Sequence, residues 1–303
     1  MKRLREWMFG YGSHIPLGVF RILAGGLAFI NLAFVFLDFE VWFTERGLTP
    51  EAFAKANHGS IWRLSLLNGV TDDRITLAVY LGTMLAALLT TVGLFTRVSA
   101  ALLFLGVISL HARNMDILHS GDTLMRAWIF ILMISPCGAA LSVDRWLRVR
   151  RGKEPIQEIS LWPQRMVVIQ LAIVYITTVW HKLLGVHWLD GTATWYTSQL
   201  TEFEHFPTPP FFSQMPFIAI ETYFALGAEV AMGTLVFWKR ARSWVILAGL
   251  ALHAGIEYSM NIPLFAAIIT AGYVAHYSGA EITRACQFVT SKIGRKVKEE
   301  AHA

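Results

Sequence analysis

The feature that most constrains the fold is a series of long apolar segments that recurs along the whole chain. A helix needs about 20 such residues to cross the roughly 30 Å hydrocarbon core of a bilayer. Only 16% of the residues are charged and 55% are hydrophobic, which is unlike the composition of a soluble domain. We therefore predict an all-α, polytopic membrane bundle of about eight transmembrane helices. The predicted spans are 15–37, 75–95, 98–112, 123–142, 165–182, 216–237, 243–260 and 263–278.

The distribution of charge predicts how this bundle is oriented. With the N-terminus in the cytoplasm, the inner segments hold 18 Lys and Arg, whereas the outer segments hold five, against 11 Asp and Glu. This asymmetry follows the positive-inside rule. We therefore expect both termini in the cytoplasm and the chain in the cytoplasmic (inner) membrane of the cell. The net charge of +5 then suits contact with the anionic inner leaflet, and no nucleic-acid partner is expected.

One charged segment divides the predicted spans into two sets of four. It reads RVRRGKEPIQEIS and lies between the fourth and fifth spans. The predicted parts are a first half at 1–147, a charged cytoplasmic linker at 148–164, a second half at 165–278 and a basic cytoplasmic tail at 279–303.

Polar side chains gather at the predicted outer ends of several spans. Ionisable groups cost a few kcal/mol each within a bilayer, so they normally face the bundle interior and find partners there. Because these residues come from different spans at one level, we predict an outward-facing, periplasmic cavity. Besides Lys182 and His119, its predicted members are Arg113, Asn114, Asp122, Arg126, His181, His187, Trp188, Glu221, His253 and Glu257.

Lys182 is the candidate for proton chemistry in this cavity. Partial desolvation and nearby cations favour the neutral amine of a lysine, which can act as a general base near pH 7. Glu221 or Glu257 close by would oppose this by stabilising the ammonium form. The alternative is structural, with Lys182 reaching to the headgroups and Trp188 part of an interfacial aromatic belt.

Other polar residues have structural alternatives as well. His119 could assist a base or lie solvated in its loop, and Asp122 could cap the fourth span and neutralise Arg126. His253 and Glu257, at i and i+4, favour a buried hydrogen-bonded pair, since the spacing fixes no third metal ligand. No metal site is predicted.

A mid-membrane glutamate has two interpretations. Glu229 could relay protons, or it could pair with Arg21 or Asn31 across the bundle.

The order of these elements resembles the membrane domain of the vitamin K-dependent gamma-carboxylase family, also called the HTTM domain. The resemblance covers about residues 10–278. It is carried by GVFRILAGGLAF, GLFTRVSA, HARNMDILHSGDTLMRAW, PCGAALSVDRW, YITTVWHKLLGVHWLDGTATWY and LALHAGIEYSMNIPLF.

The resemblance implies a chemistry and a cofactor. Lys182 matches the position of the base that deprotonates vitamin K hydroquinone, His119 resembles a supporting loop histidine, and His253 looks like a family position. A quinol cofactor and a carboxylation or epoxidation type of modification are implied, acting on a peptide or small molecule. Two departures stand out. His181 replaces a second lysine, and the basic tail follows where the carboxylase has a large extramembrane domain. We therefore expect a partner membrane or periplasmic protein to present the substrate.

Two other functions remain open from the sequence. The chain could be a non-enzymatic maturation, assembly or immunity subunit that binds a membrane protein or peptide, in which case activity survives loss of Lys182. It could also conduct protons through Glu221, Glu229 and Glu257, although the polar residues thin out toward the inner side.

Overall fold

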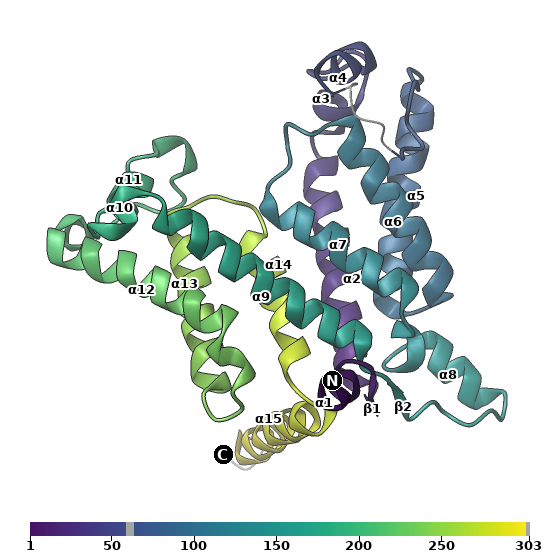
Figure 1. Ribbon diagram of the computed structural model, residues 1–303. Helices are drawn as coiled ribbons and strands as arrows, with labels where there is room; N and C mark the ends of the chain where they lie inside the picture. Colours follow the sequence, from purple (N-terminus) through teal and green to yellow (C-terminus); the bar gives the residue numbers. More distant parts are fainter. Residues whose placement is uncertain (59–63, 301–303) are drawn as a thin grey trace.

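The computed structural model of the protein describes residues 1–58 and 64–300. For residues 57–58 and 293–300 it describes the backbone alone. Part of the predicted outer segment 38–74, residues 59–63, and the end of the predicted tail, residues 301–303, lie outside the described residues. The described part is mostly helical, as predicted, and its helices form two groups that meet along α9 (Figure 1).

The first group contains four long helices, of which the last three are joined by short connections. Asp72 caps the second of them by accepting a hydrogen bond from the backbone N–H of Arg74, and Gly93 ends it in a left-handed conformation, two common helix signals. Two short helices follow the first long helix at one end of the group. The long helices are α2 (Ile15–Phe36), α5 (Asp73–Val92), α6 (Thr96–Arg113) and α7 (Ser120–Ile134), and the short ones are α3 (Phe39–Phe43) and α4 (Glu51–His58).

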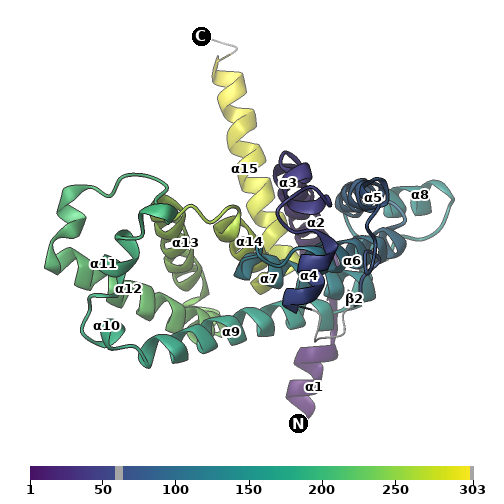
Figure 2. The same ribbon diagram turned by 90° about the horizontal axis from the view of Figure 1, so that it is seen from above.

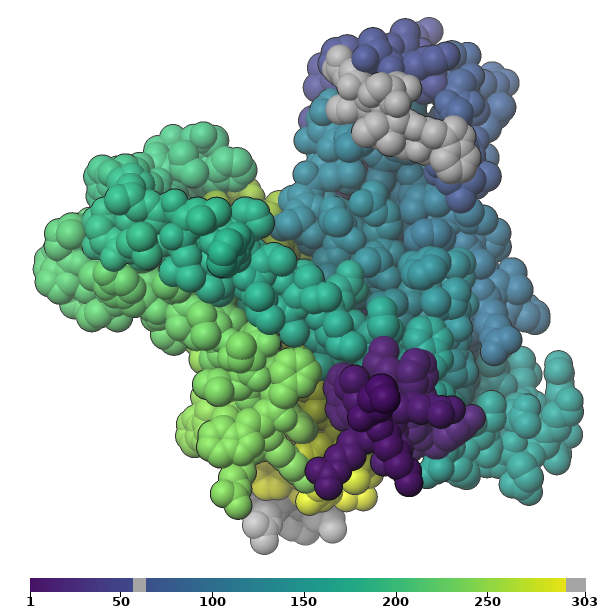
Figure 3. Space-filling model, viewed as in Figure 1, coloured from purple at the N-terminus to yellow at the C-terminus, as the bar shows by residue number. Residues whose placement is uncertain are grey.

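The second group contains α9 and the helices that follow it. Short helical turns connect α9 to α12 on the same side of the molecule as α3 and α4 (Figure 1). The elements are α9 (Trp162–Leu183), α10 (Val186–Leu189), α11 (Ala193–Ser198), η2 (Thr201–Phe203), η3 (Pro210–Ser213), α12 (Met215–Gly233), η4 (Leu235–Phe237), α13 (Arg242–Ser259), α14 (Phe265–Ala271) and η5 (Gly272–His276). Figure 3 shows that the two groups stand apart at this end and join toward the other.

The opposite end carries the basic elements and both chain termini (Figure 1). A two-stranded antiparallel sheet pairs Tyr11 with Ser160 and so fastens the N-terminus to the charged linker. Helices α1 and α15 extend across the direction of the long helices (Figure 2). The elements are α1 (Lys2–Phe9), β1 (Tyr11–Ser13), η1 (Cys137–Ala139), α8 (Val143–Arg150), β2 (Glu158–Ser160) and α15 (Gly279–Glu300).

Each predicted span coincides with a helical segment, but not every segment is long. Among the described residues, four helices are long and apolar enough to cross a membrane, namely α2, α5, α9 and α12. Within the predicted span 123–142, the helix α7 ends at Ile134. Pro136 follows, and Ser135, the residue before this proline, is extended. A residue that precedes proline is disfavoured in helical conformation. The span predicted at 216–237 likewise ends at Gly233 before a short 3-10 turn.

The last apolar segment lies at the centre of the molecule. Helix α14 packs against α2, α7 and α13, and η5 packs against α2 and α9. Trp128 of α7 is fully buried there, with its ring edge-on to Phe20 at 5.2 Å between centroids. A Cβ at Gly272 would lie only 2.7 Å from the Trp128 ring. The absence of a side chain at Gly272 therefore allows η5 to approach α7 closely.

Arg21 of α2 is fully buried and organises the basic end of the first group. Its guanidinium donates to the carbonyl oxygens of Cys137 (2.9 Å), Ala140 (2.9 Å) and Leu141 (2.6 Å). These carbonyls belong to the irregular segment between α7 and α8, which has no helical ladder of its own to satisfy them. One buried cation therefore fixes this connection against α2.

Gly106 of α6 provides a test of close helix packing. A Cβ there would lie 2.0 Å from the Oγ1 of Thr83 in α5, so we expect Gly106→Ala to force the two helices apart and to cost about 1–3 kcal/mol of stability. Gly82→Ala, on α5, is the matched control because nothing lies within 4 Å of its added methyl. Thermal unfolding of both variants in one detergent checks the difference, and equal midpoints would contradict this packing.

Candidate functional site

The central feature of the site is an ion pair between α9 and α12. Lys182 Nζ donates to Glu229 Oε1 over 2.7 Å, and their side chains are only 22% and 8% exposed. The second carboxylate oxygen of Glu229, Oε2, is buried without a hydrogen-bond partner among the described residues. From the sequence, Glu229 was open to two interpretations, a proton relay or a pairing with Arg21 or Asn31. That pairing is wrong because Arg21 binds backbone carbonyls and Asn31 binds Asp122.

The ion pair forms because α12 extends well beyond the end of α9. Gly233, the last residue of α12, lies against Ile176 of α9, so Glu229, one turn earlier in α12, lies level with the end of α9. Reasoning from upright spans put these two residues at different depths. Glu221 lies eight residues before Glu229, about 12 Å farther along α12, and is therefore not beside Lys182.

Trp188, in the short helix that follows α9, covers the ion pair. The Lys182 Nζ lies 4.3 Å from the centroid of the Trp188 ring, a cation–π geometry. The indole also packs against Ala225, Ala228 and Leu252 of α12 and α13. The short helix α10 thus folds back over the end of α9, and it closes the site with an aromatic face.

A chain of three polar side chains lies two turns deeper on the same face of α9. Tyr175 Oη is 2.9 Å from His253 Nε2 of α13 and 2.5 Å from Tyr273 Oη of η5. Since Tyr175 and Lys182 are seven residues apart, they share one side of α9. The other ring nitrogen of His253 is buried and unpartnered within the described part of the chain. The pair predicted between His253 and Glu257 is therefore wrong, since His253 binds tyrosine.

His119 and Asp122 form a cap at the start of α7. His119 Nδ1 accepts from the backbone N–H of Gly121 (3.0 Å), while Asp122 Oδ2 accepts from the backbone N–H of His119 (2.9 Å). Asp122 Oδ1 accepts from Asn31 of α2 (2.7 Å). The predicted capping role of Asp122 agrees with this geometry, but its carboxylate binds Asn31 and His119 and not Arg126.

His119 approaches the ion-pair region only through an intervening ring. The Phe265 centroid lies 6.3 Å from that of His119 and 5.6 Å from that of His253. Because Nδ1 of His119 already accepts a hydrogen bond, the geometry favours a structural use of this residue.

Arg113 and Asn114 lie in a different place, at the end of α6. Arg113 pairs with Glu45 (2.7 Å) and Glu51 (3.1 Å), and Asn114 donates to Thr49 Oγ1 (3.0 Å). These contacts hold the α3–α4 segment onto the first group and do not reach Lys182. The prediction that both line the same cavity is therefore corrected.

The ion pairs of Arg113 with Glu45 and Glu51 lead to a second test. We expect Arg113→Leu to release the α3–α4 segment, because two carboxylates lose their common partner, and to leave the Lys182 region intact. Limited proteolysis should then cut within residues 39–58 at least about tenfold faster than in wild type, which corresponds to the loss of roughly 1.4 kcal/mol of local stability. Arg46→Leu, an exposed arginine in the same segment, is the control and should be cut at the wild-type rate.

The remaining predicted residues lie outside the ion-pair region. The His181 ring nitrogen Nδ1 lies 2.7 Å from the Thr177 carbonyl oxygen one turn earlier, a hydrogen-bond distance. His187 is exposed beside Asp190, whose pKa is lowered by a hydrogen bond from the Thr192 hydroxyl. In the described residues, Glu257 has no side-chain hydrogen bond, and its carbonyl meets His205 Nδ1 at 2.7 Å.

The structure thus brings together Lys182, Trp188 and His253 from the predicted set and adds Glu229, Tyr175 and Tyr273. One signal for Tyr175 was in the sequence, namely its seven-residue spacing from Lys182 along an apolar segment. Within the described ranges 1–58 and 64–300, no group of three or more His, Cys, Asp or Glu side chains could hold a metal ion.

Among the described residues, four apolar helices have spanning length. A polar centre with the Lys182–Glu229 ion pair lies among α9, α12, α13 and η5. These features define the class, a helical membrane protein with an ion pair between its helices. The family model described as the HTTM domain matches residues 13–277, most of the 303-residue chain. The protein belongs to the HTTM family. Neither the curated proteins nor the solved structures contain a match.

Proposed function

We propose that this HTTM protein is a membrane enzyme in which the Lys182–Glu229 pair accepts a proton from a hydroxyl group of a quinol. The reaction would be a modification of the carboxylation or epoxidation type on a peptide or small molecule. The observation that carries the proposal is the 2.7 Å hydrogen bond between a partly exposed amine and a buried carboxylate. Paired ionisable groups within membrane helices are typical of functional sites.

The pair gives the amine a route to its basic form. In water an ammonium–carboxylate pair stays charged, but desolvation favours the neutral pair of amine and carboxylic acid. One proton moving along the hydrogen bond from Lys182 Nζ to Glu229 Oε1 produces that state. The free amine can then accept the proton of a substrate hydroxyl, which becomes an anion held beside the new ammonium.

The residues around the pair fit a quinol. Trp188 offers a ring face, and Phe265 and the tyrosines line the deeper part with aromatic edges. Two buried atoms, Glu229 Oε2 and His253 Nδ1, have no partner in the described part of the chain and can bind hydroxyl groups. A bound quinol supplies an acidic hydroxyl and reducing equivalents. Lys182 and Glu229 orient that hydroxyl, and Trp188 limits the access of water.

Copurification tests the proposal. Wild-type protein extracted with native lipid should retain quinone, measured by chromatography and mass spectrometry per mole of protein. Trp188→Ala should retain about tenfold less, since a base-stacking aromatic contributes roughly 1–3 kcal/mol to binding a flat ring. Trp146→Ala, an exposed tryptophan on α8, is the control. Wild-type protein without quinone would contradict the proposal.

One observation favours a second, non-enzymatic function. The segment between α10 and α12 exposes several large aromatic side chains, which is typical of protein-binding surfaces. They are Trp195, Tyr196, Phe203, Phe206 and Phe211. A maturation or assembly subunit would bind a membrane or periplasmic partner here. In that case Lys182→Ala keeps the biological activity, and changes in these aromatics remove it.

We further propose that all eight apolar segments cross the cytoplasmic membrane, with both termini inside. Support comes from the common position of the termini, α1, α8 and α15 at one end (Figure 1) and from the basic residues these elements carry. A fluorescent protein that matures only in the cytoplasm should fluoresce when fused after residue 303 or inserted at Gly152. The same insertion at Gly191 should stay dark, and fluorescence at Gly191 would contradict this topology.

A further inference from the structure

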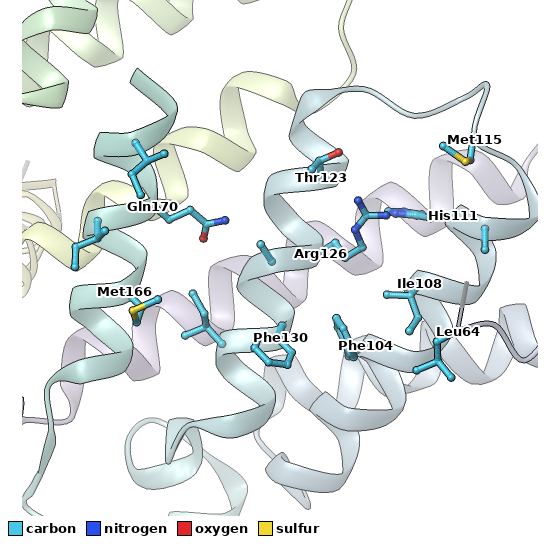
Figure 4. A pocket seen from close by; sticks show the side chains of 15 residues that line it. Leu64, Phe104, Ile108, His111, Met115, Thr123, Arg126, Phe130, Met166 and Gln170 are labelled. Carbon is cyan, nitrogen blue, oxygen red and sulfur yellow. The ribbon is translucent and has the colours of Figure 1, made fainter. Parts of the chain in front are cut away.

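A cavity lies between α9 and the first group of helices, away from the ion pair. Its volume is about 840 Å³, and it is bounded by α6, α7 and α9 (Figure 4). That volume is in the range of small-molecule sites in proteins. Met166, Ile169, Gln170 and Ile173 line it from α9. At 100° per residue they lie on the side of α9 opposite Tyr175 and Lys182, so this cavity and the ion-pair site are separate.

One end of the cavity is polar. Arg126, His111, Thr123 and Gln170 line it, and Figure 4 shows the Arg126 guanidinium beside the His111 ring, with the Gln170 amide reaching in from α9. Across the described residues, Arg126 makes neither a hydrogen bond nor an ion pair. His111 Nδ1 and Gln170 Oε1 are buried and also lack a partner there.

This lack of partners needs a physical explanation. Buried polar atoms are nearly always hydrogen-bonded, and an arginine within a membrane helix is almost always paired. Asp122 lies one turn before Arg126 but binds Asn31 and His119 instead. The unpaired Arg126 cation at this cavity therefore indicates a ligand with a negative charge and hydrogen-bond acceptors. The unpartnered Gln170 Oε1 is itself an acceptor and calls for a donor, such as a hydroxyl of the same ligand.

The rest of the cavity is apolar and extends away from Arg126. Its walls are Phe104, Ile108, Phe130, Ile131, Met166, Ile169 and Ile173. A ligand that satisfies both ends has a charged head and a hydrocarbon tail. Arg126 lies six residues into α7, about 9 Å from the start of the helix, which is within reach of a lipid headgroup that enters beside the helix.

We propose that this cavity binds an anionic phospholipid, with its phosphate on Arg126 and one acyl chain along the apolar wall. A guanidinium matches phosphate oxygens in a two-pronged hydrogen-bonding geometry. His111 and the Gln170 amide complete the coordination of the headgroup, and Thr123 adds a hydroxyl. An uncharged ring ligand such as a quinone would leave the arginine charge uncompensated in a medium of low dielectric constant.

Lipid competition tests the proposal. Detergent-purified protein is mixed with equimolar phosphatidylglycerol and phosphatidylcholine of identical chains, and the bound lipid is identified by native mass spectrometry. Wild type should bind phosphatidylglycerol at least about tenfold more, as expected for a charge-assisted hydrogen bond. Arg126→Gln should remove this preference, and Arg46→Gln, an exposed arginine elsewhere, should keep it.

Two further variants separate the possible explanations. Ile169→Trp fills the apolar wall and leaves Arg126 in place, so it should lower lipid binding if a chain occupies the cavity. Lys182→Ala should leave the preference unchanged, because the ion-pair site is on the other side of α9.

Several outcomes would overturn the proposal. The first is equal binding of the two lipids by wild type, and the second is an equal loss of preference in Arg126→Gln and Arg46→Gln. The third is full displacement of the lipid by inorganic phosphate alone, which would assign the site to a free ion. Retention of a quinone in place of phosphatidylglycerol, lost in Arg126→Gln, would also contradict it.

Discussion

Replacing Lys182 with alanine is expected to lower the rate of quinol-dependent turnover by about 10²–10⁴-fold, the usual contribution of a general base. The reason is the position of the amine, which is 2.7 Å from Glu229 and covered by Trp188. Within the described residues, no other lysine hydrogen-bonds Glu229, Tyr175 or His253. The measurement is the oxidation of a soluble quinol analogue by dissolved oxygen in the presence of purified protein, monitored by ultraviolet absorbance.

A conservative variant separates the base from the ion pair. Lys182→Arg can keep the charge interaction with Glu229, but a guanidinium does not deprotonate in proteins. We expect Lys182→Arg to unfold near the wild-type temperature and yet to be as slow as Lys182→Ala. If Lys182→Arg kept the wild-type rate, the pair would be structural and the base would lie elsewhere.

Replacing Arg21 with leucine is expected to destabilise the protein by about 3–5 kcal/mol. The change leaves the carbonyls of Cys137, Ala140 and Leu141 without their donor in a buried place, and each unpaired group costs roughly 1–3 kcal/mol, not additively. For a chain of this size the loss lowers the unfolding midpoint by about 10 °C. Thermal unfolding in detergent, followed by circular dichroism, measures it.

The control for Arg21 is an exposed arginine near the same connection. Arg151→Leu follows α8 at the surface, so its midpoint should stay within about 2 °C of wild type, since surface substitutions usually change stability by less than 0.5 kcal/mol. If the two variants unfolded at the same temperature, Arg21 would not hold the α7–α8 connection.

Much of the fold could be predicted from the sequence because apolar runs report directly on membrane helices. The predicted and observed bounds of the first span, 15–37 and 15–36, agree closely. The differences arise where local chemistry ends a helix inside an apolar run, as Pro136 does. Hydropathy does not register such an ending, since the residues on both sides remain apolar. The small sheet was missed because three-residue strands have no periodicity to detect.

Less of the site could be predicted, because the position of a residue within its span does not give the height of one helix relative to another. Lys182, Trp188 and His253 were recognised as candidates, and they do lie together. Glu229 was expected near mid-membrane, as a proton relay or a partner of Arg21 or Asn31, whereas α12 extends past α9 and carries Glu229 to the end of α9. The roles of Lys182 and His119 in catalysis stay predictions.

The central position of α14 and η5 has a consequence for biosynthesis. These residues leave the ribosome after α2, α7, α9 and α13, yet all four of those helices pack against them. Until they insert, Trp128 lacks a neighbour at Gly272, and Tyr175 lacks the Tyr273 hydroxyl. Helices inserted earlier therefore lie in the bilayer without the central segment that they pack against. A nascent chain stalled before residue 265 should then be a preferred target for membrane quality-control proteases.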